Sequence, residues 1–130
     1  WTLIVDCGTA ITYDVLSPDG VFLGGNIAPG VYMRLEALNH YTARLPLVET
    51  SGDCPRWGTD TETALRSGAI SGVVSEMRYY RNLLPVADPK VVLTGGSADL
   101  VSQRAGFDLI VDTEIVSKGL NSIINYNENI

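Results

Sequence analysis

The chain is poor in the residues that build metal clusters, disulfide frameworks and membrane helices. Its 130 residues include one histidine, His40, and two cysteines, Cys7 and Cys54, which do not form a zinc-type or disulfide-type pattern. No apolar run approaches the roughly 20 residues that a membrane helix needs, and no basic leader opens the sequence. We therefore expect reduced cysteines, a cytoplasmic location and no membrane partner.

Positive charge is also scarce. Nine lysines and arginines stand against fifteen acidic residues, so the formal net charge is −6. The basic residues form no cluster in the sequence, which argues against nucleic acid as a partner. A phosphate-bearing ligand would have to be bound locally, by backbone N–H groups or a cation.

Apolar residues, by contrast, are abundant. Apolar residues make up 45% of the sequence and charged residues 18%, a composition typical of a single globular domain with its own core. The first six residues, WTLIVD, already have the pattern of a buried strand. We therefore expect this domain to be a piece of a longer protein.

Three strands are predicted near the start, at residues 1–6, 10–16 and 21–30. About three small residues separate the first two strands, and the turn sequence SPDG precedes the third. Connections this short allow only antiparallel neighbours, because a parallel pair needs a crossover of a dozen or more residues. The sequence thus predicts an antiparallel meander.

The middle of the chain is predicted to be helical. Residues 31–45 carry apolar side chains at helical spacing, and a second helix is expected from Asp60 or Thr61 to Pro85. Between them, residues 46–60 contain two prolines and two glycines and should form a long loop. Loops of this length within a compact domain are often functional.

The last third alternates between strands and helices. We expect strands at residues 89–94 and 107–112, a short helical piece at 97–105 and a final helix at 113–126. Strand–helix–strand order implies parallel strands joined by right-handed crossovers. The predicted fold class is therefore α/β, with a mixed five-stranded sheet of three antiparallel strands followed by two parallel strands.

The turn between the first two strands contains the candidate phosphate-binding and cation-binding residues. Asp6 ends the first strand, and the small residues that follow expose backbone N–H groups beside the Thr9 hydroxyl, an arrangement that can hold phosphate oxygens. Asp6 could hold the accompanying cation. An ordinary hairpin with a capping aspartate explains this turn equally well. Gly95 and Gly96 favour a nucleotide site, since they follow a strand where ligands approach the backbone of α/β sheets.

A phosphate turn between strands, paired with a later Gly-Gly loop, resembles the plan of the actin-like and sugar-kinase-like ATPases, which have a ribonuclease H-like fold. The resemblance is closest to the carboxyl-terminal half of the type III pantothenate kinases. It is carried by the segments DCGTAITYDVLSPDGVFLGGNIAPGVYMRLEAL, TARLP, WGTDTETALRSGAISG, VVLTGG and KGLN, in that order. Together these segments span nearly the whole chain.

The resemblance implies an enzyme that phosphorylates pantothenate with ATP, the first step toward coenzyme A. It further implies a homodimer that needs magnesium and a monovalent cation, potassium or ammonium. By motif position, Asp6 is the expected cation ligand and Thr61 the expected pantothenate contact. The expected ATP-binding residues are Gly8, Thr9, Gly95 and Gly96.

Two family motifs do not occur here. The first phosphate loop, D-x-G-N-T, and the G-x-D-R motif with the catalytic base both lie upstream in the family. The sequence GTDT at Gly58 lacks the arginine and follows the wrong element. We therefore expect no catalytic base in this chain, a missing amino-terminal domain and no kinase activity from these residues alone.

Other candidates have simpler explanations. Asp14 fits a solvated turn carboxylate better than a magnesium ligand, and His40 fits a helix end, where its charge meets the helix dipole. Cys7 lacks a basic partner nearby in sequence and fits a packing role. Arg66 stays a candidate donor for the pantothenate carboxylate.

The long helix is the expected dimer surface, because it offers more small and apolar residues than one sheet face requires: Gly68, Gly72, Met77, Tyr79, Tyr80 and Leu83. Two other functions stay open. One is a non-catalytic nucleotide-binding regulator of the same fold, similar to accessory transcription factors. The other is a structural domain that binds no ligand.

Overall fold

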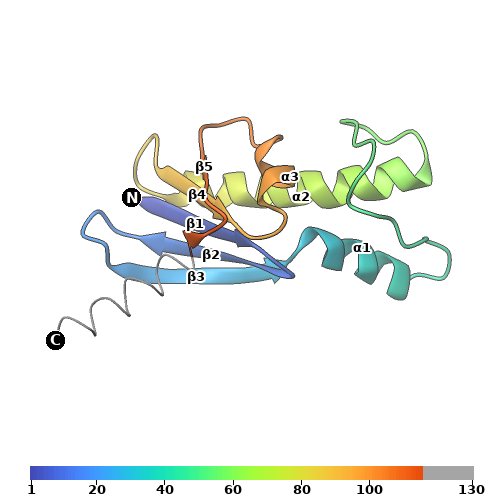
Figure 1. Cartoon of the computed structure of the whole chain (residues 1–130), viewed down its shortest axis with the longest axis horizontal. Helices are drawn as coiled ribbons and strands as arrows, with labels where there is room; N and C mark the ends of the chain where they lie inside the picture. The colour runs from blue at the N-terminus through green and yellow to red at the C-terminus, as the bar shows by residue number, and fades with distance from the viewer. Residues whose placement is uncertain (116–130) are drawn as a thin grey trace.

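A computed structural model describes residues 1–115 of the chain (Figure 1). The fold is α/β, with one five-stranded mixed sheet in the order β3-β2-β1-β4-β5. In chain order the elements are β1 (Thr2–Cys7), β2 (Ala10–Leu16), β3 (Phe22–Pro29), α1 (Val31–His40), α2 (Thr61–Leu83), β4 (Lys90–Thr94), α3 (Ala98–Ser102) and β5 (Ile110–Val111). The predicted fold class is confirmed.

The first three strands form the predicted antiparallel meander. Cys7 pairs with Ile11 across the first turn, and Ala10 pairs with Pro29 at the same end of the sheet. The second turn is closed by a hydrogen bond from the Gly20 N–H to the Ser17 carbonyl oxygen, 2.9 Å. Because both turns are short, the order and direction of these strands follow from local sequence alone.

β1 lies in the centre of the sheet, with β2 on one side and β4 on the other. β4 runs parallel to β1, and Asp6 at the end of β1 pairs with Thr94 at the end of β4. β5 continues the sheet in parallel with β4. The carboxyl ends of β1 and β4 therefore lie next to each other, at the end of the sheet that we call the sheet edge. This arrangement places the two segments that follow these strands side by side.

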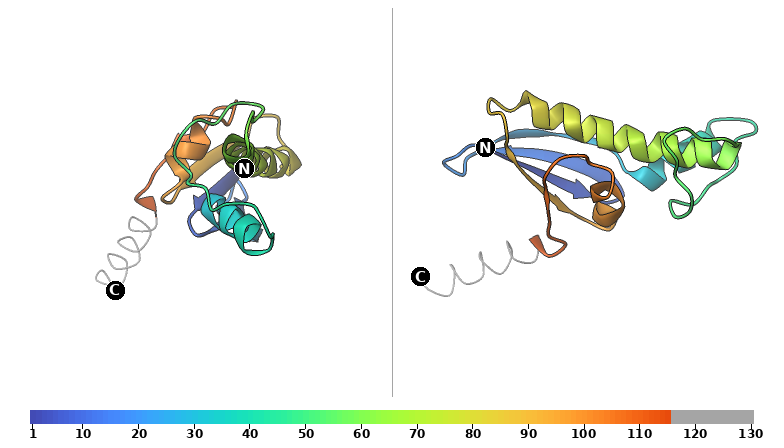
Figure 2. Two further views of the ribbon diagram at one scale, coloured as in Figure 1. Left: turned by 90° about the vertical axis from the view of Figure 1, so that its right-hand side faces the viewer. Right: turned by 90° about the horizontal axis from the view of Figure 1, so that it is seen from above.

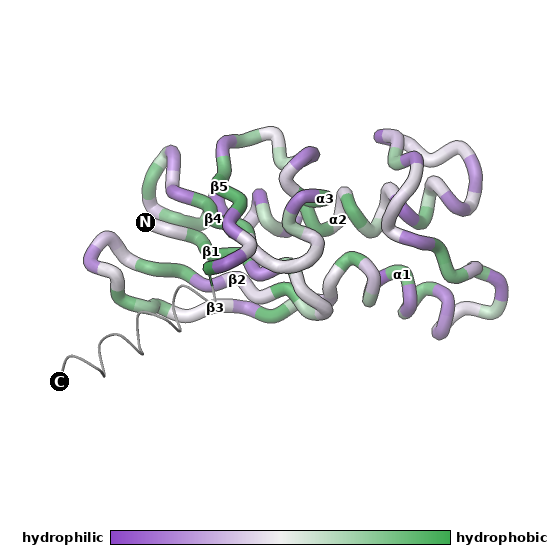
Figure 3. The backbone as a smooth tube through the Cα atoms, viewed as in Figure 1, coloured by the Kyte–Doolittle hydropathy of each residue, from purple (hydrophilic) through white to green (hydrophobic). Residues whose placement is uncertain are grey.

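The core lies between α2 and one face of the sheet (Figure 2). Leu3, Val5 and Cys7 of β1 are fully buried, as are Val73 and Met77 of α2. The helices alternate hydrophobic and hydrophilic residues, as expected for elements with one buried side (Figure 3). Within residues 1–115, no helix combines the length and the apolar character that crossing a bilayer requires.

α2 begins where the sequence predicted. The Asp60 side chain accepts a hydrogen bond from the Thr63 N–H at 2.8 Å, and the Thr63 hydroxyl oxygen accepts one from the Asp60 N–H at 3.2 Å. This reciprocal capping box satisfies donors that would otherwise lack partners at the first turn. The hydrogen bonds from the Thr63 hydroxyl and backbone lower the pKa of Asp60.

Two elements are clearly shorter than predicted, and a third cannot be compared. α1 ends at His40 rather than near residue 45, and the Asn39 side chain then bonds the Leu45 carbonyl oxygen at 2.8 Å. β5 is confined to Ile110–Val111, because only these residues pair with β4. The predicted final helix lies almost wholly outside the described residues, as does the KGLN segment.

Candidate functional site

The predicted phosphate turn is a tight connection between β1 and β2. Gly8 and Thr9 are the residues between the two strands, and the Thr9 side chain is exposed. The turn stands at the carboxyl end of β1, at the sheet edge where β4 also ends. The exposed Thr9 side chain therefore faces outward from the turn that the sequence predicted between the first two strands.

Gly30 supports the turn from behind. Its N–H donates a hydrogen bond to the Thr9 carbonyl oxygen at 3.0 Å. A Cβ on Gly30 would lie 2.3 Å from the Thr9 oxygen and 2.5 Å from the Gly8 oxygen, so a larger residue does not fit. Sequence reasoning treated Gly30 only as the end of a strand and missed this role. The Pro29-Gly30 pair before a helix was the available signal.

Gly95 brings the second predicted loop into contact with Asp6. Its φ is +93°, and a Cβ there would lie 2.7 Å from both Asp6 Oδ1 and the Cys7 carbonyl carbon. The Ser97 N–H donates to the Cys7 carbonyl oxygen at 3.0 Å, which fastens the loop to β1. No atom lies within 4 Å of the position for a Cβ on Gly96, so the surface beside it is open.

The Asp6 carboxylate is half-buried, and no group of residues 1–115 donates a hydrogen bond or forms an ion pair to it. A partly buried carboxylate without such a partner suits a cation. The described part of the chain contains no group of three His, Cys, Asp or Glu residues arranged to hold a metal ion. A cation at Asp6 would therefore need phosphate, water or backbone oxygens, or groups from outside these residues, to complete its coordination.

Cys7 is part of the core and does not face a ligand. Its side chain is fully buried, and burial, with a smaller contribution from the Asp6 charge, raises the pKa of the thiol to about 11. A thiol with that pKa stays protonated near neutral pH and is a poor nucleophile. The predicted packing role is confirmed.

The chain is similar to known proteins over most of its length. Residues 1–82 match the model of the family described as type III pantothenate kinase. The chain belongs to this family. The type III pantothenate kinase of Porphyromonas gingivalis is 39% identical over 130 residues, covering 96% of this chain and 53% of that protein. That of Phocaeicola vulgatus is 42% identical over 128 residues, covering 97% and 53%.

The chain spans about half the length of these curated relatives. Among solved structures, a Campylobacter jejuni protein described as a conserved Baf family transcriptional activator shares the fold with a TM-score of 0.76 and 28% identity. That match covers 99% of this chain and 59% of the other. The fold is that of the actin-like ATPases, to which the pantothenate kinase family belongs.

Thr61 lies apart from the other predicted site residues. It is the first residue of α2, at the end of the helix pair that extends beyond the sheet, whereas the Gly8-Thr9 turn lies at the sheet edge (Figure 1). Thr61 lines an apolar groove of about 350 Å³ between α1 and α2, with Leu38, Leu45 and Gly68 among the other lining residues.

Arg66 has a structural role instead of the predicted one. Its side chain is buried, and its guanidinium donates to the Glu49 and Asp53 carbonyl oxygens, both at 2.9 Å, and to Glu62 Oε1 at 2.7 Å. These hydrogen bonds hold the long loop against α2. The guanidinium therefore donates its hydrogen bonds within its own chain. The prediction that Arg66 donates to the pantothenate carboxylate was wrong.

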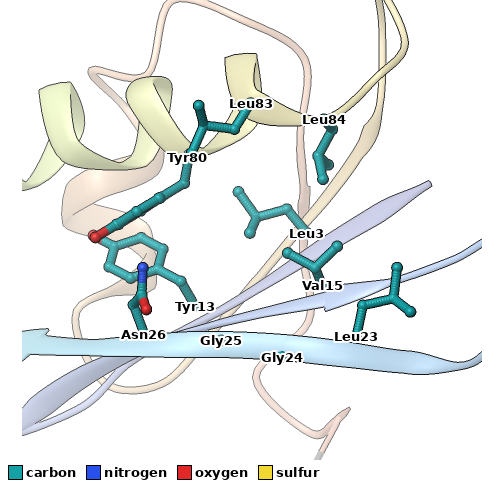
Figure 4. A pocket seen from close by; sticks show the side chains of 10 residues that line it. All are labelled: Leu3, Tyr13, Val15, Leu23, Gly24, Gly25, Asn26, Tyr80, Leu83 and Leu84. Atoms are coloured by element: carbon teal, nitrogen blue, oxygen red, sulfur yellow. The ribbon is translucent and has the colours of Figure 1, made fainter.

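A further apolar groove, of about 330 Å³, lies between the carboxyl-terminal part of α2 and strands β2 and β3 (Figure 4). Tyr13 and Tyr80 form one wall, with ring centroids 4.6 Å apart, and Leu3, Val15 and Leu84 lie deeper. None of the predicted site residues lines this groove. It is separate from the phosphate turn.

Proposed function

We propose that this chain is the carboxyl-terminal half of a kinase that phosphorylates pantothenate with ATP. The observation that carries the proposal is the contact between the Asp6 to Thr9 segment and Gly95. Two loops far apart in sequence meet at the sheet edge, one suited to phosphate and one suited to close approach of a nucleoside. Family membership supports the choice of substrate.

In this proposal ATP lies across the two loops. Phosphate oxygens accept hydrogen bonds from the N–H groups of the Gly8-Thr9 turn and from the Thr9 hydroxyl. The nucleoside lies along Gly95 and Gly96, where the surface is open. Magnesium bound to the phosphates offsets their charge, and Asp6 holds a cation, either magnesium or a monovalent ion such as potassium or ammonium.

The reaction transfers the γ-phosphoryl group to a pantothenate hydroxyl. The hydroxyl oxygen forms a bond to the γ-phosphorus, the bond between that phosphorus and the bridging oxygen breaks, and ADP leaves with that oxygen. The hydroxyl proton passes to a base. Such transfer depends on positioning and on charge stabilisation from both sides of the phosphate, and this chain supplies one side. The base and the second phosphate loop belong to the upstream half.

The test compares this chain with the same chain joined to its upstream half. Both are assayed for ADP formation with ATP, pantothenate, magnesium and potassium. We expect turnover only from the joined protein, since loss of a general base alone costs about a hundred- to ten-thousand-fold. Comparable turnover by the chain alone would show that the base lies within it, at a residue such as Asp14 or Asp60.

The protein is further proposed to form a homodimer through α2. Fewer residues of α2 are available for a dimer contact than the sequence predicted. Met77 is fully buried in the core of its own chain, and Tyr80 packs on Tyr13. Tyr79 and Leu83 remain 61% exposed each. These two residues, with the exposed Gly68, form the surface that we assign to the partner copy.

A second candidate function is a nucleotide-binding regulator without kinase activity. It is favoured by the structural match to the Campylobacter jejuni protein described as a transcriptional activator. Such a regulator would keep the nucleotide contacts of the Gly8-Thr9 turn and Gly95. It predicts a rise in melting temperature on adding ATP and magnesium, with no ADP formed by the complete protein.

A further inference from the structure

Three arginines that are distant in sequence line one concave surface beside α2. The surface encloses about 340 Å³ and is lined by Arg56, Ser71, Val74, Ser75, Arg78 and Arg104. Arg56 comes from the loop before α2, and Arg104 follows α3. Figures 1 and 2 show that this loop and α3 both lie beside α2, which contributes the other lining residues.

No acidic residue lines this arginine pocket. Of the four arginines outside the pocket, Arg34, Arg66 and Arg81 are paired with Glu76, Glu62 and Asp88, and Arg44 is exposed on the surface without an ion pair to residues 1–115. Within residues 1–115, the guanidinium groups of Arg56 and Arg104 form no hydrogen bond or ion pair. A protein with a formal charge of −6 thus leaves these cations unpaired at one place, where an anion would gain from them.

The pocket wall is built on fixed structure. Ser71, Ser75 and Arg78 stand at i, i+4 and i+7 of α2, so they share one face of the helix. Arg78 donates one hydrogen bond, at 2.9 Å, to the Ala105 carbonyl oxygen, which ties the segment after α3 to α2. Nearby, Arg81 stacks over the Phe107 ring at 4.9 Å. These contacts hold α2 and the segment after α3 together.

We propose that the arginine pocket binds a compact phosphate-class anion, such as pyrophosphate or the phosphate group of a small ester. One guanidinium group can donate two parallel hydrogen bonds to the oxygens of a phosphate, and the serine hydroxyls can donate to the same oxygens. The volume suits a small molecule, and the net negative charge of the chain disfavours a long polyanion. The pocket shares no residue with the Asp6 to Thr9 turn or with Gly95 and Gly96, so it is a second anion site.

The test measures pyrophosphate binding to the full chain by titration calorimetry, without magnesium and with ionic strength held constant by sodium chloride. The double variant Arg56→Gln, Arg104→Gln should bind at least about tenfold more weakly, since hydrogen bonds to charged groups each contribute strongly. Arg44→Gln, which removes an exposed arginine outside the pocket, is the matched control and should bind as the original chain does. An equal loss in the control would show a general charge effect and overturn the proposal.

A second pair of variants locates the bound anion. Thr9→Ala, in the proposed nucleotide turn, should leave the pocket's binding intact, and abolition of all pyrophosphate binding by this variant would overturn the proposal. Arg104→Lys keeps the charge but loses the paired N–H donors. We therefore expect Arg104→Lys to bind pyrophosphate several-fold more weakly than the original chain, a smaller loss of affinity than in the double variant. Unaltered affinity in the double variant, with unfolding midpoints equal to the original, would also refute the pocket.

Discussion

Arg34 of α1 and Glu76 of α2 form a two-contact ion pair, with Nη2 of the arginine 3.0 Å from both carboxylate oxygens. Glu76 also accepts a hydrogen bond from the Tyr13 hydroxyl at 2.7 Å. Arg34 Nε donates to the Pro29 carbonyl oxygen at 2.9 Å. The pair therefore joins α1, α2, the sheet and Pro29, the residue before Gly30.

We expect Glu76→Gln to lower the free energy of unfolding by about 1–3 kcal/mol, because a partly buried charged partner is lost from several hydrogen bonds. Urea unfolding measures the change. Asp88→Asn is the matched control: Asp88 pairs with Arg81 at 3.0 Å but is 81% exposed, so its loss should cost under about 1 kcal/mol. Equal costs for the two variants would contradict a special role for the Arg34–Glu76 pair.

Gly95→Ala tests the contact between the two loops. Its positive φ should cost about 1–2 kcal/mol in any non-glycine residue, and the clash with Asp6 and Cys7 should add about 1–3 kcal/mol. Gly20→Ala is the control, since Gly20 has a φ of +78° with no atom within 4 Å of a Cβ. If Gly95→Ala destabilises the chain no more than Gly20→Ala, the loops do not pack as described.

Cys7 should make stability fall at alkaline pH. Its pKa is about 11 in the folded chain against an ordinary 9.0, so the folded state holds the proton more tightly. The resulting stabilisation is fully present below pH 9 and is lost as pH rises from 9 toward 11. We expect about 1 kcal/mol of this loss between pH 9 and 10.

Cys7→Ala should remove this part of the pH dependence, as followed by urea unfolding at several pH values. Cys54→Ala, at a half-buried position, should keep the pH profile of the original chain. Tyr13, whose pKa is also raised by burial and by its bond to Glu76, adds a further loss only above pH 10. Parallel profiles for Cys7→Ala and the original chain would disprove the assignment.

Asp6→Asn in the complete protein should reduce kcat by at least about a hundredfold, as removal of a group that stabilises charge in the transition state does. The fold should stay intact, because Asp6 accepts no hydrogen bond within residues 1–115. Steady-state kinetics over a range of potassium concentrations measure the effect, with Asp19→Asn in an exposed turn as the control. Unchanged rates and an unchanged potassium response would exclude Asp6 as a cation ligand.

Leu83→Asp should convert the proposed dimer to a monomer, because a charge would enter an apolar contact. Light scattering after size exclusion gives the mass of the complete protein. Val86→Asp, at a 42% exposed position beyond the end of α2, is the control and should leave the mass unchanged. A monomer mass for the unaltered protein would end the dimer proposal.

The sequence by itself determined the order of strands and helices and the residues of the phosphate turn. The alternation of β1 and β2, the SPDG turn and the Asp60 cap act over a few residues, where backbone sterics and side-chain periodicity decide conformation. The parallel direction of β4 and β5 also followed from the strand–helix–strand order of this segment. The sequence also indicated both loops as candidate ligand-binding segments, and the contact between Gly95 and Asp6 was found only in the structure.

Only the tertiary structure decided which side chains meet. The charge of Arg66 suggested a ligand contact, but packing of the long loop buried it against backbone carbonyls. Gly30 became a support for Thr9, and Arg56, Arg78 and Arg104 gathered at one surface although the sequence scatters them. Such contacts join segments tens of residues apart, and they depend on how all the layers pack together. Such long-range contacts cannot be predicted from a local sequence pattern.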